Sequence, residues 1–124
     1  MIVAGFGLRT TATRDSLEAA LALTAARFAA KVTDLAVVAD KADLPAIRNL
    51  AAATGLPLHA VALPDLDQSR AQTLSPHQPT RYGKASVAEA AALAVAGAGG
   101  ILIQTRLISP DGLATVAIAE GTGL

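Results

Sequence analysis

The residues best placed to receive an anion follow the first apolar run of the sequence. Residues 2–6 are apolar and predict a buried strand, which leads into Gly5-Phe6-Gly7-Leu8-Arg9-Thr10-Thr11. Glycines let a ligand approach the backbone closely, and the N-terminus of a following helix favours negative charge. A strand-turn-helix of this kind predicts an anion site. The alternative, of equal weight, is that Gly5 and Gly7 only permit a tight turn and that Arg9 is solvated.

A nucleotide is the less favoured anion for this segment. Thr10 stands where the dinucleotide fingerprint has its third glycine, and the sequence contains no Gly-Lys-Ser or Gly-Lys-Thr phosphate loop. The glycine-rich run at 97–100 precedes a predicted strand instead of following one. We therefore interpret that run as a connection.

Two further groups of polar side chains follow predicted strands. Asp40 and Lys41 come directly after the second apolar run, and His77 and Lys84 lie in the long segment after the third. In open α/β sheets, ligands bind outside the carboxyl ends of the strands. If the three strands are parallel, these groups share one edge with Arg9 and give it local positive charge.

Each of these groups also has a purely structural interpretation. Asp40 beside Lys41 is more typical of a solvated charge pair at a helix entrance than of a ligand contact. Ser86 and Glu89 lie three positions apart at the start of an apolar run, which is the pattern of a capping box. A helix cap is favoured there over catalytic use.

Metal and thiol chemistry are not expected. His77 has a side chain that titrates near neutrality, but the only other histidine is His59, which we interpret as a packed or edge histidine of a strand. The sequence has no cysteine, which excludes disulfides, thiolate metal sites and a cysteine nucleophile. We predict no metal and no cofactor.

Apolar periodicity predicts three helices among about five strands. The strands are expected at residues 2–6, 35–39, 58–61, 101–108 and 113–119. The helices are expected at 14–30, from an N-cap at Asp43 to about Thr54, and at 87–96. The segment 62–85 contains three prolines and little periodicity, so it is expected to be a functional or mobile loop.

Short-range signals predict where the helices begin and end. Thr13 or Asp15 is expected to cap the first helix, and Asp15 with Glu18 resembles a capping box. Gly55 and Gly97 are expected to end the second and third helices.

Strands that alternate with helices predict right-handed crossovers and helices on both faces of a sheet. The turn Ser109-Pro110-Asp111-Gly112 joins the last two strands into an antiparallel hairpin. We therefore expect an α/β fold, three-layer α/β/α, with a mixed, mainly parallel sheet and a C-terminal β-hairpin. Residues 1–124 are expected to form a single domain, because the sequence shows no repeat or linker.

The overall charge argues against two classes of partner. The chain of 124 residues has 10 basic and 10 acidic residues, so no global field attracts nucleic acid or an anionic membrane. The sequence starts without a basic leader, and the apolar run at 90–103 is too short to span a bilayer. We expect a cytoplasmic protein that binds neither nucleic acid nor membrane.

Four segments in this order resemble one known family. They are Gly5-Phe6-Gly7-Leu8-Arg9, Asp40-Lys41, Ser86-Val87-Ala88-Glu89-Ala90-Ala91-Ala92-Leu93 and Thr115-Val116-Ala117-Ile118-Ala119. Together they are similar to the CobE / CbiG C-terminal domain family of cobalamin (vitamin B12) biosynthesis, in its stand-alone CobE form. The resemblance covers nearly the whole chain.

The resemblance implies a protein that binds a precorrin or corrin intermediate as a carrier or accessory factor. Such intermediates are flat macrocycles with many carboxylate arms, which cationic side chains meet through charge-assisted hydrogen bonds. The ligand-binding residues implied are Gly5, Gly7, Arg9, Thr10, Thr11, Asp40, Lys41, His77, Lys84, Ser86 and Glu89.

Two alternatives stay open. The first is hydrolysis of a precorrin lactone, which needs a general base or a positioned water; Asp40, His77 and Glu89 are the candidates. The second is an interaction module that docks onto a methyltransferase of the pathway through its small, alanine-rich surface.

Overall fold

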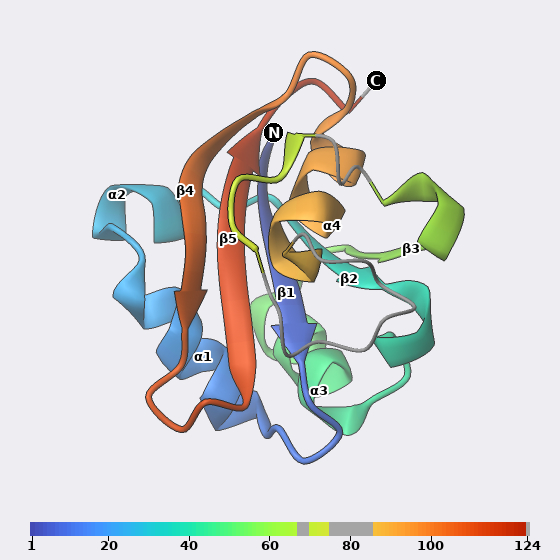
Figure 1. Cartoon of the computed structure of the whole chain (residues 1–124). Helices are drawn as coiled ribbons and strands as arrows, with labels where there is room; N and C mark the ends of the chain where they lie inside the picture. The colour runs from blue at the N-terminus through green and yellow to red at the C-terminus, as the bar shows by residue number, and fades with distance from the viewer. Residues whose placement is uncertain (67–69, 75–85, 124) are drawn as a thin grey trace.

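One mixed sheet of five strands forms the centre of the computed structural model, which describes residues 1–66, 70–74 and 86–123 (Figure 1). The strands are β1 (Ile2–Leu8), β2 (Asp34–Val38), β3 (Leu58–Val61), β4 (Ile101–Ile108) and β5 (Ala114–Glu120). The helices are α1 (Arg14–Leu23), α2 (Ala26–Ala29), α3 (Pro45–Thr54) and α4 (Val87–Ala96), with 3-10 turns η1 (Ala39–Lys41) and η2 (Leu63–Asp65).

The strand order β3-β2-β1-β5-β4 combines parallel and antiparallel pairs. β1 pairs parallel with β2, and β2 pairs parallel with β3. β5 runs antiparallel to both β1 and β4, so β4 has the same direction as β1. The expected mixed, mainly parallel sheet with a C-terminal hairpin is confirmed.

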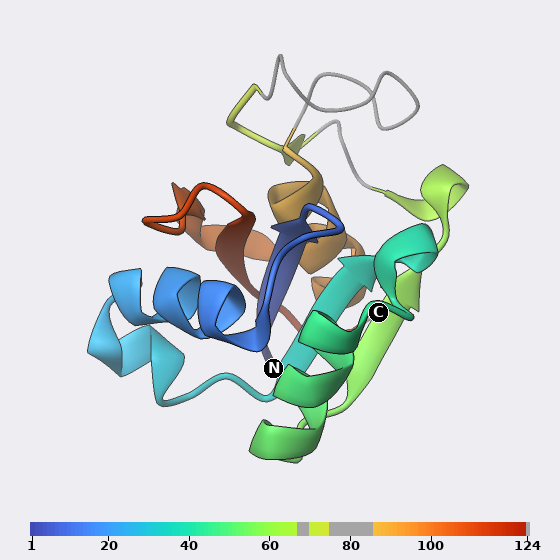
Figure 2. The ribbon, with the colours of Figure 1, turned by 90° about the horizontal axis from the view of Figure 1, so that it is seen from below.

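Helices cover both faces of this sheet (Figures 1 and 2). Along β1, Ala4, Phe6 and Leu8 point into the core shared with α1 and α3, whereas Val3 packs in the core beneath α4. The alternation follows from the period of two in a strand. Because both faces of β1 are buried, its sequence is apolar at nearly every position instead of alternating between apolar and polar residues. The predicted α/β/α layering is confirmed.

The first predicted helix is two helices. α1 ends at Leu23, where the Thr24 backbone N–H and its Oγ1 both donate to the carbonyl oxygen of Leu21. The short α2 follows at Ala26–Ala29. The expectation of one helix over 14–30 is therefore wrong. A threonine hydroxyl that bonds to the preceding turn competes with continued helix, and apolar periodicity does not register this.

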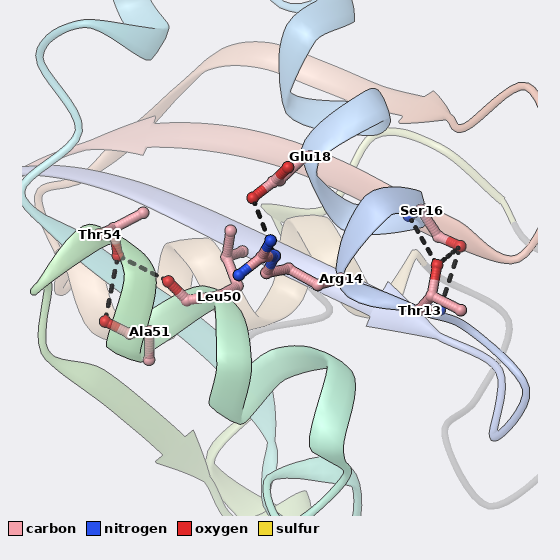
Figure 3. A network of polar contacts seen from close by, with 7 residues as sticks. All are labelled: Thr13, Arg14, Ser16, Glu18, Leu50, Ala51 and Thr54. Atoms are coloured by element: carbon pink, nitrogen blue, oxygen red, sulfur yellow. Dashed lines mark hydrogen bonds and ion pairs between the residues drawn. The ribbon is translucent and has the colours of Figure 1, made fainter.

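Thr13 caps α1, and the box is not the predicted one (Figure 3). Thr13 Oγ1 accepts from the Ser16 backbone N–H, while Ser16 Oγ accepts from the Thr13 N–H. Asp15 lies in the first turn, and Glu18 pairs with Arg14 at 3.3 Å. The capping box expected from Asp15 and Glu18 is wrong, since Ser16 fills the reciprocal position.

The other two predicted helices, α3 and α4, end at the expected glycines, but the N-cap of α3 differs from the prediction. Gly55 ends α3 in the left-handed conformation, with φ of 70°, and Gly97 follows α4. Asp43 does not cap α3; the N-cap is Leu44, without a side-chain hydrogen bond. Asp43 instead pairs with Arg48 at 2.7 Å on the surface, so the predicted N-cap is wrong by one position.

Candidate functional site

The carboxyl ends of the parallel strands meet at one edge, which Figure 2 shows from below. β1 leads there into the turn that carries Arg9, Thr10 and Thr11, and β2 leads into η1 with Asp40 and Lys41. Because β1 and β2 are neighbours, the two groups follow adjacent strands. We call these five residues the carboxyl edge.

The turn that carries Arg9 is fixed by backbone hydrogen bonds. The Arg9 N–H donates to the carbonyl oxygen of Leu113 at 2.9 Å, and the Ala12 N–H donates to the Arg9 carbonyl oxygen at 3.0 Å. Arg9, Thr10 and Thr11 themselves are exposed. The backbone is thus held by the hairpin while the side chains face solvent.

Neither Arg9 nor Lys41 forms an ion pair with a carboxylate of the described residues. Arg14 and Arg48 each form an ion pair with a carboxylate, and Arg27 lies over the Phe28 ring at 4.8 Å. Within residues 1–66, 70–74 and 86–123, no carboxylate lies within ion-pair distance of Arg9 or Lys41. The described part of the chain therefore provides no ionic partner for these two cations.

A cavity adjoins η1 on the side of α3. It has a volume of about 320 Å³. Its surface is polar and apolar in similar measure, and its lining consists of four apolar residues and one ion pair: Ala39, Ala42, Leu58, Ala60, Asp43 and Arg48. An open pocket of mixed polar and apolar lining therefore lies beside the turn that carries Lys41.

The N-terminus of α1, where an anion was expected to benefit, already has a carboxylate beside it. Ser16 Oγ donates to Asp111 Oδ2 at 2.6 Å, and Asp111 Oδ1 accepts from Ser109 Oγ and the Leu113 N–H. The hydrogen bonds from Ser109, Ser16 and Leu113 lower the pKa of Asp111. An incoming anion would meet this negative charge, so the cations of the edge matter more than the helix end.

Gly5 and Gly7 lie within β1, which continues to Leu8, and the expected turn at these glycines is wrong. A Cβ on Gly5 would collide with the Ala88 carbonyl oxygen and lie 2.7 Å from the Ala92 nitrogen. A Cβ on Gly7 would lie 2.6 Å from Thr115 Oγ1. The two glycines let α4 and β5 approach β1, which is a packing role.

Glu89 is fully buried, and its carboxylate accepts from several protein donors. Oε1 accepts the N–H groups of Gln72 and Thr73 at 2.6 and 2.8 Å, and Oε2 accepts from Thr73 Oγ1 at 2.6 Å and the Arg106 N–H at 2.7 Å. Burial raises the pKa of Glu89, but the hydrogen bonds from Thr73, Arg106 and Gln72 outweigh it and lower the pKa. This carboxylate is a structural anchor.

Half of the predicted capping box at α4 is present. Ser86 Oγ accepts from the Glu89 N–H at 3.3 Å, so Ser86 is the cap as predicted. The Glu89 side chain does not return to Ser86, whose N–H donates to the Thr73 carbonyl oxygen instead. The prediction of a reciprocal capping box is wrong, because the Glu89 carboxylate bonds to residues of other segments instead of to the Ser86 backbone N–H.

Arg70 is a structural residue that the sequence did not reveal. Its guanidinium donates to the carbonyl oxygens at the end of α4 and just beyond: Leu93, Gly97, Ala98 and Gly100. A cation at a helix C-terminus is favourable because the last carbonyls lack partners. Arg70 and Thr73 thus bind residues 70–74 to both ends of α4. The sequence offered only one indication of this role, a charged residue in a segment with no predicted helix or strand.

A second polar group lies where β2 begins. Asp34 Oδ2 is 2.7 Å from His59 Nε2, and Asp34 Oδ1 accepts from Thr33 Oγ1 at 2.6 Å. Burial raises the pKa of Asp34, but the hydrogen bonds from Thr33 and His59 outweigh it and lower the pKa. His59 is an edge-strand histidine as interpreted from the sequence; the carboxylate partner was not foreseen.

Two of the predicted ligand-binding residues are not among the residues that the structure describes. His77 and Lys84 lie outside the described residues. No group of three metal-ligating side chains occurs within the described parts of the chain. No helix among them is long and apolar enough to cross a bilayer.

The fold and the carboxyl edge together define a small three-layer α/β domain with an exposed Arg9 and a half-buried Lys41 near a pocket of mixed lining. The family model described as cobalamin synthesis G C-terminus matches residues 2–119. The chain therefore belongs to this family, and it is a protein of cobalamin biosynthesis. The resemblance drawn from the four sequence segments is confirmed.

Two solved structures are similar over nearly the full length. The crystal structure of cobalamin biosynthesis protein chiG from Agrobacterium tumefaciens is 37% identical, with a TM-score of 0.74, and the match covers 98% of this chain and 99% of that chain. CobE, a protein from the cobalamin biosynthetic pathway, is 30% identical, with a TM-score of 0.85, and the match covers 100% of this chain and 92% of that one. No curated protein matches the chain.

Proposed function

We propose that this chain binds a precorrin or corrin intermediate at its carboxyl edge, as a carrier or accessory factor of cobalamin biosynthesis. The observation that carries the proposal is the pair Arg9 and Lys41, which follow adjacent parallel strands and form no ion pair with a carboxylate of the described residues. The family membership gives the ligand class.

The chemistry of the ligand matches these groups. A corrin precursor carries several carboxylate arms around a largely apolar ring. Charge-assisted hydrogen bonds from Arg9 and Lys41, with the Thr10 and Thr11 hydroxyls, suit the arms. The pocket beside η1 adds the apolar side chains of Ala39, Ala42 and Leu58 for contact with part of the ring. Binding sites commonly combine an apolar lining with a few polar groups.

The hydrogen bonds of Glu89 argue against this residue as the general base of a lactone hydrolase. A general base needs a free lone pair within reach of the proton it removes. The Glu89 carboxylate is buried and already accepts from Gln72, Thr73 and Arg106. It is therefore unsuited to act as the base, which removes one of the three candidates for that reaction.

A titration followed in the visible spectrum tests the proposal. The probe is hydrogenobyrinic acid, a cobalt-free corrin with free carboxylate arms. Wild-type protein is expected to perturb its spectrum at micromolar concentration. Arg9→Ala and Lys41→Ala are each expected to weaken binding about tenfold or more, because each removes a hydrogen bond to a charged group.

The matched control is Lys31→Ala, which removes an exposed cation just before β2, at the opposite end of the strand from η1. It is expected to bind like wild type. No perturbation by wild-type protein, or an equal loss in Lys31→Ala, would refute binding at the carboxyl edge.

A further inference from the structure

The turn that carries Arg9, Thr10 and Thr11 is attached at its start to the C-terminal hairpin. The Arg9 N–H donates to the carbonyl oxygen of Leu113 at 2.9 Å, and the turn closes where the Ala12 N–H donates to the Arg9 carbonyl oxygen at 3.0 Å. The place of Arg9 in the carboxyl edge therefore depends on where the hairpin holds the Leu113 carbonyl.

The end of the turn is attached to α1 through Thr13, the N-cap of that helix (Figure 3). The Thr13 N–H donates to Ser16 Oγ at 3.1 Å, and the Ser16 N–H donates to Thr13 Oγ1 at 3.3 Å. Ser16 is only 2% exposed. The place where the turn ends therefore depends on the position of the Ser16 side chain.

The carboxylate of Asp111 connects these two attachments. Its Oδ1 accepts from the Leu113 N–H at 3.0 Å, and its Oδ2 accepts from Ser16 Oγ at 2.6 Å. Ser109 Oγ also donates to Oδ1 and orients the carboxylate. One side chain in the hairpin turn thus bonds to the residue that holds the start of the Arg9 turn and to the residue that holds its end.

We propose that Asp111 is a positioning residue of the carboxyl edge. It fixes both ends of the turn and so holds Arg9, Thr10 and Thr11 in the arrangement that meets the carboxylate arms of the ring. This inference rests on the proposed function, because it takes these three residues as ligand contacts. Asp111 itself does not contact the ring; it acts through the hairpin and through α1.

The exposure of the turn explains why it needs a positioning residue. Arg9, Thr10 and Thr11 are all exposed, so packing does not hold their side chains, and their placement depends on the backbone. A loop that becomes ordered only on binding lowers the affinity, whereas a turn that is already ordered does not. Hydrogen bonds to an ionised carboxylate are stronger than those between neutral groups, which suits a contact at the surface.

The charge of Asp111 predicts the opposite effect on binding, so the sign of the change in affinity decides between the two roles. A negative charge near an anion site repels the ligand, and its removal alone would strengthen binding. If Asp111 positions the turn, its removal weakens binding although the repulsion is lost. Asp15 is the matched comparison, because it is a carboxylate in the first turn of α1 and takes no part in these hydrogen bonds.

The experiment is a titration with hydrogenobyrinic acid followed in the visible spectrum. Asp111→Ala is expected to bind about three- to tenfold more weakly than wild type, because the turn must then be ordered on binding. Asp111→Asn keeps an acceptor for the Leu113 N–H and is expected to fall between Asp111→Ala and wild type. Asp15→Ala is expected to bind as tightly as wild type or more tightly.

A double-variant comparison separates positioning from a general weakening of the fold. In an Arg9→Ala background, Asp111→Ala is expected to cause less than about twofold further loss, because the main side chain that it positions is already absent. In a Lys41→Ala background it is expected to cause the full loss, since Lys41 follows a different strand. A general weakening of the fold would lower the affinity equally in both backgrounds.

Amide hydrogen exchange of the free protein, followed by NMR, reports on the turn itself. The Arg9 and Ala12 N–H groups are expected to exchange faster in Asp111→Ala than in wild type, because the turn opens more often. Circular dichroism checks that the variant folds. Unchanged exchange at both amides would refute the attachment through Asp111.

The outcomes separate this inference from the proposed function. If Arg9→Ala and Lys41→Ala bind more weakly while Asp111→Ala binds as tightly as wild type or more tightly, positioning by Asp111 is refuted and binding at the carboxyl edge stands. Equal losses in the two backgrounds also refute it. If wild-type protein does not perturb the spectrum of the ring, both proposals fail.

Discussion

The role of Glu89 in the structure differs from the role that its position in the sequence predicts. In the sequence it sits three positions after Ser86, the spacing of a local helix cap. In the structure its carboxylate bonds to residues far along the chain, Thr73 and Arg106. β4 is irregular between Gln104 and Leu107, where the Arg106 N–H donates to Glu89 instead of to β5. A buried charge is tolerated because protein donors replace water.

Replacing Glu89 with glutamine is expected to lower the free energy of unfolding by about 2–3 kcal/mol. The amide has one acceptor oxygen and places N–H donors against the N–H groups that now point at the carboxylate. Urea denaturation measures the change. Glu18→Gln is the control, because Glu18 forms only a half-exposed ion pair with Arg14, and its loss is expected to cost about 0.5 kcal/mol or less. Equal losses in the two variants would contradict the anchor role.

At the scale of elements, the close approach of α4 to the sheet depends on small residues. α4 consists mainly of alanines, and most of its residues are buried. β1 presents Gly5 and Gly7 to this layer, so a helix backbone fits where a side chain would otherwise stand. The glycines that suggested a ligand turn therefore support helix-sheet packing.

Gly5→Ala is expected to destabilise the protein by about 3 kcal/mol, because the new Cβ would meet the backbone of α4, which has no room to yield. Gly7→Ala would meet only the Thr115 side chain, which can rotate, and about 1 kcal/mol is expected. Chemical denaturation of both measures the order. Gly99→Ala serves as control, since a Cβ there has no neighbour within 4 Å. A Gly5→Ala protein as stable as Gly99→Ala would disprove the packing argument.

At the scale of the whole molecule, two carboxylates join segments that are distant in sequence. Glu89 joins α4 to residues 72–73 and to β4. Asp111 joins the hairpin turn to Ser16 of α1, 95 positions away. Both carboxyl groups have a pKa below the ordinary value in the folded state. Contacts of this kind give stability only while the carboxyl groups are ionised.

Acid is therefore expected to weaken the fold in a defined range. A folded pKa below the unfolded one contributes stability that is complete above the ordinary carboxyl pKa of about 4 and is lost as the pH falls through the folded value. The free energy of unfolding should stay level from neutral pH to about 5 and then decline. The double variant Glu89→Gln, Asp111→Asn should be less stable at neutral pH and decline less steeply. Parallel curves for the two proteins would show that these groups do not set the acid response.

The sequence by itself determined the fold class, the hairpin and most element positions. Residues 58–61, 87–96 and 101–108 were predicted with the bounds observed, since local apolar period and flanking glycines specify such elements. It also determined the family, through segments spaced along the chain.

Only the tertiary structure decided what the polar and glycine residues do. Gly5 became a packing residue because α4 lies across it, and Glu89 an anchor because residues 72–73 and β4 reach it. Asp34 forms a hydrogen bond with His59 because β2 and β3 are neighbours in the sheet. These roles depend on contacts between residues far apart in the chain, and local patterns carry no information about which distant donors will surround a side chain.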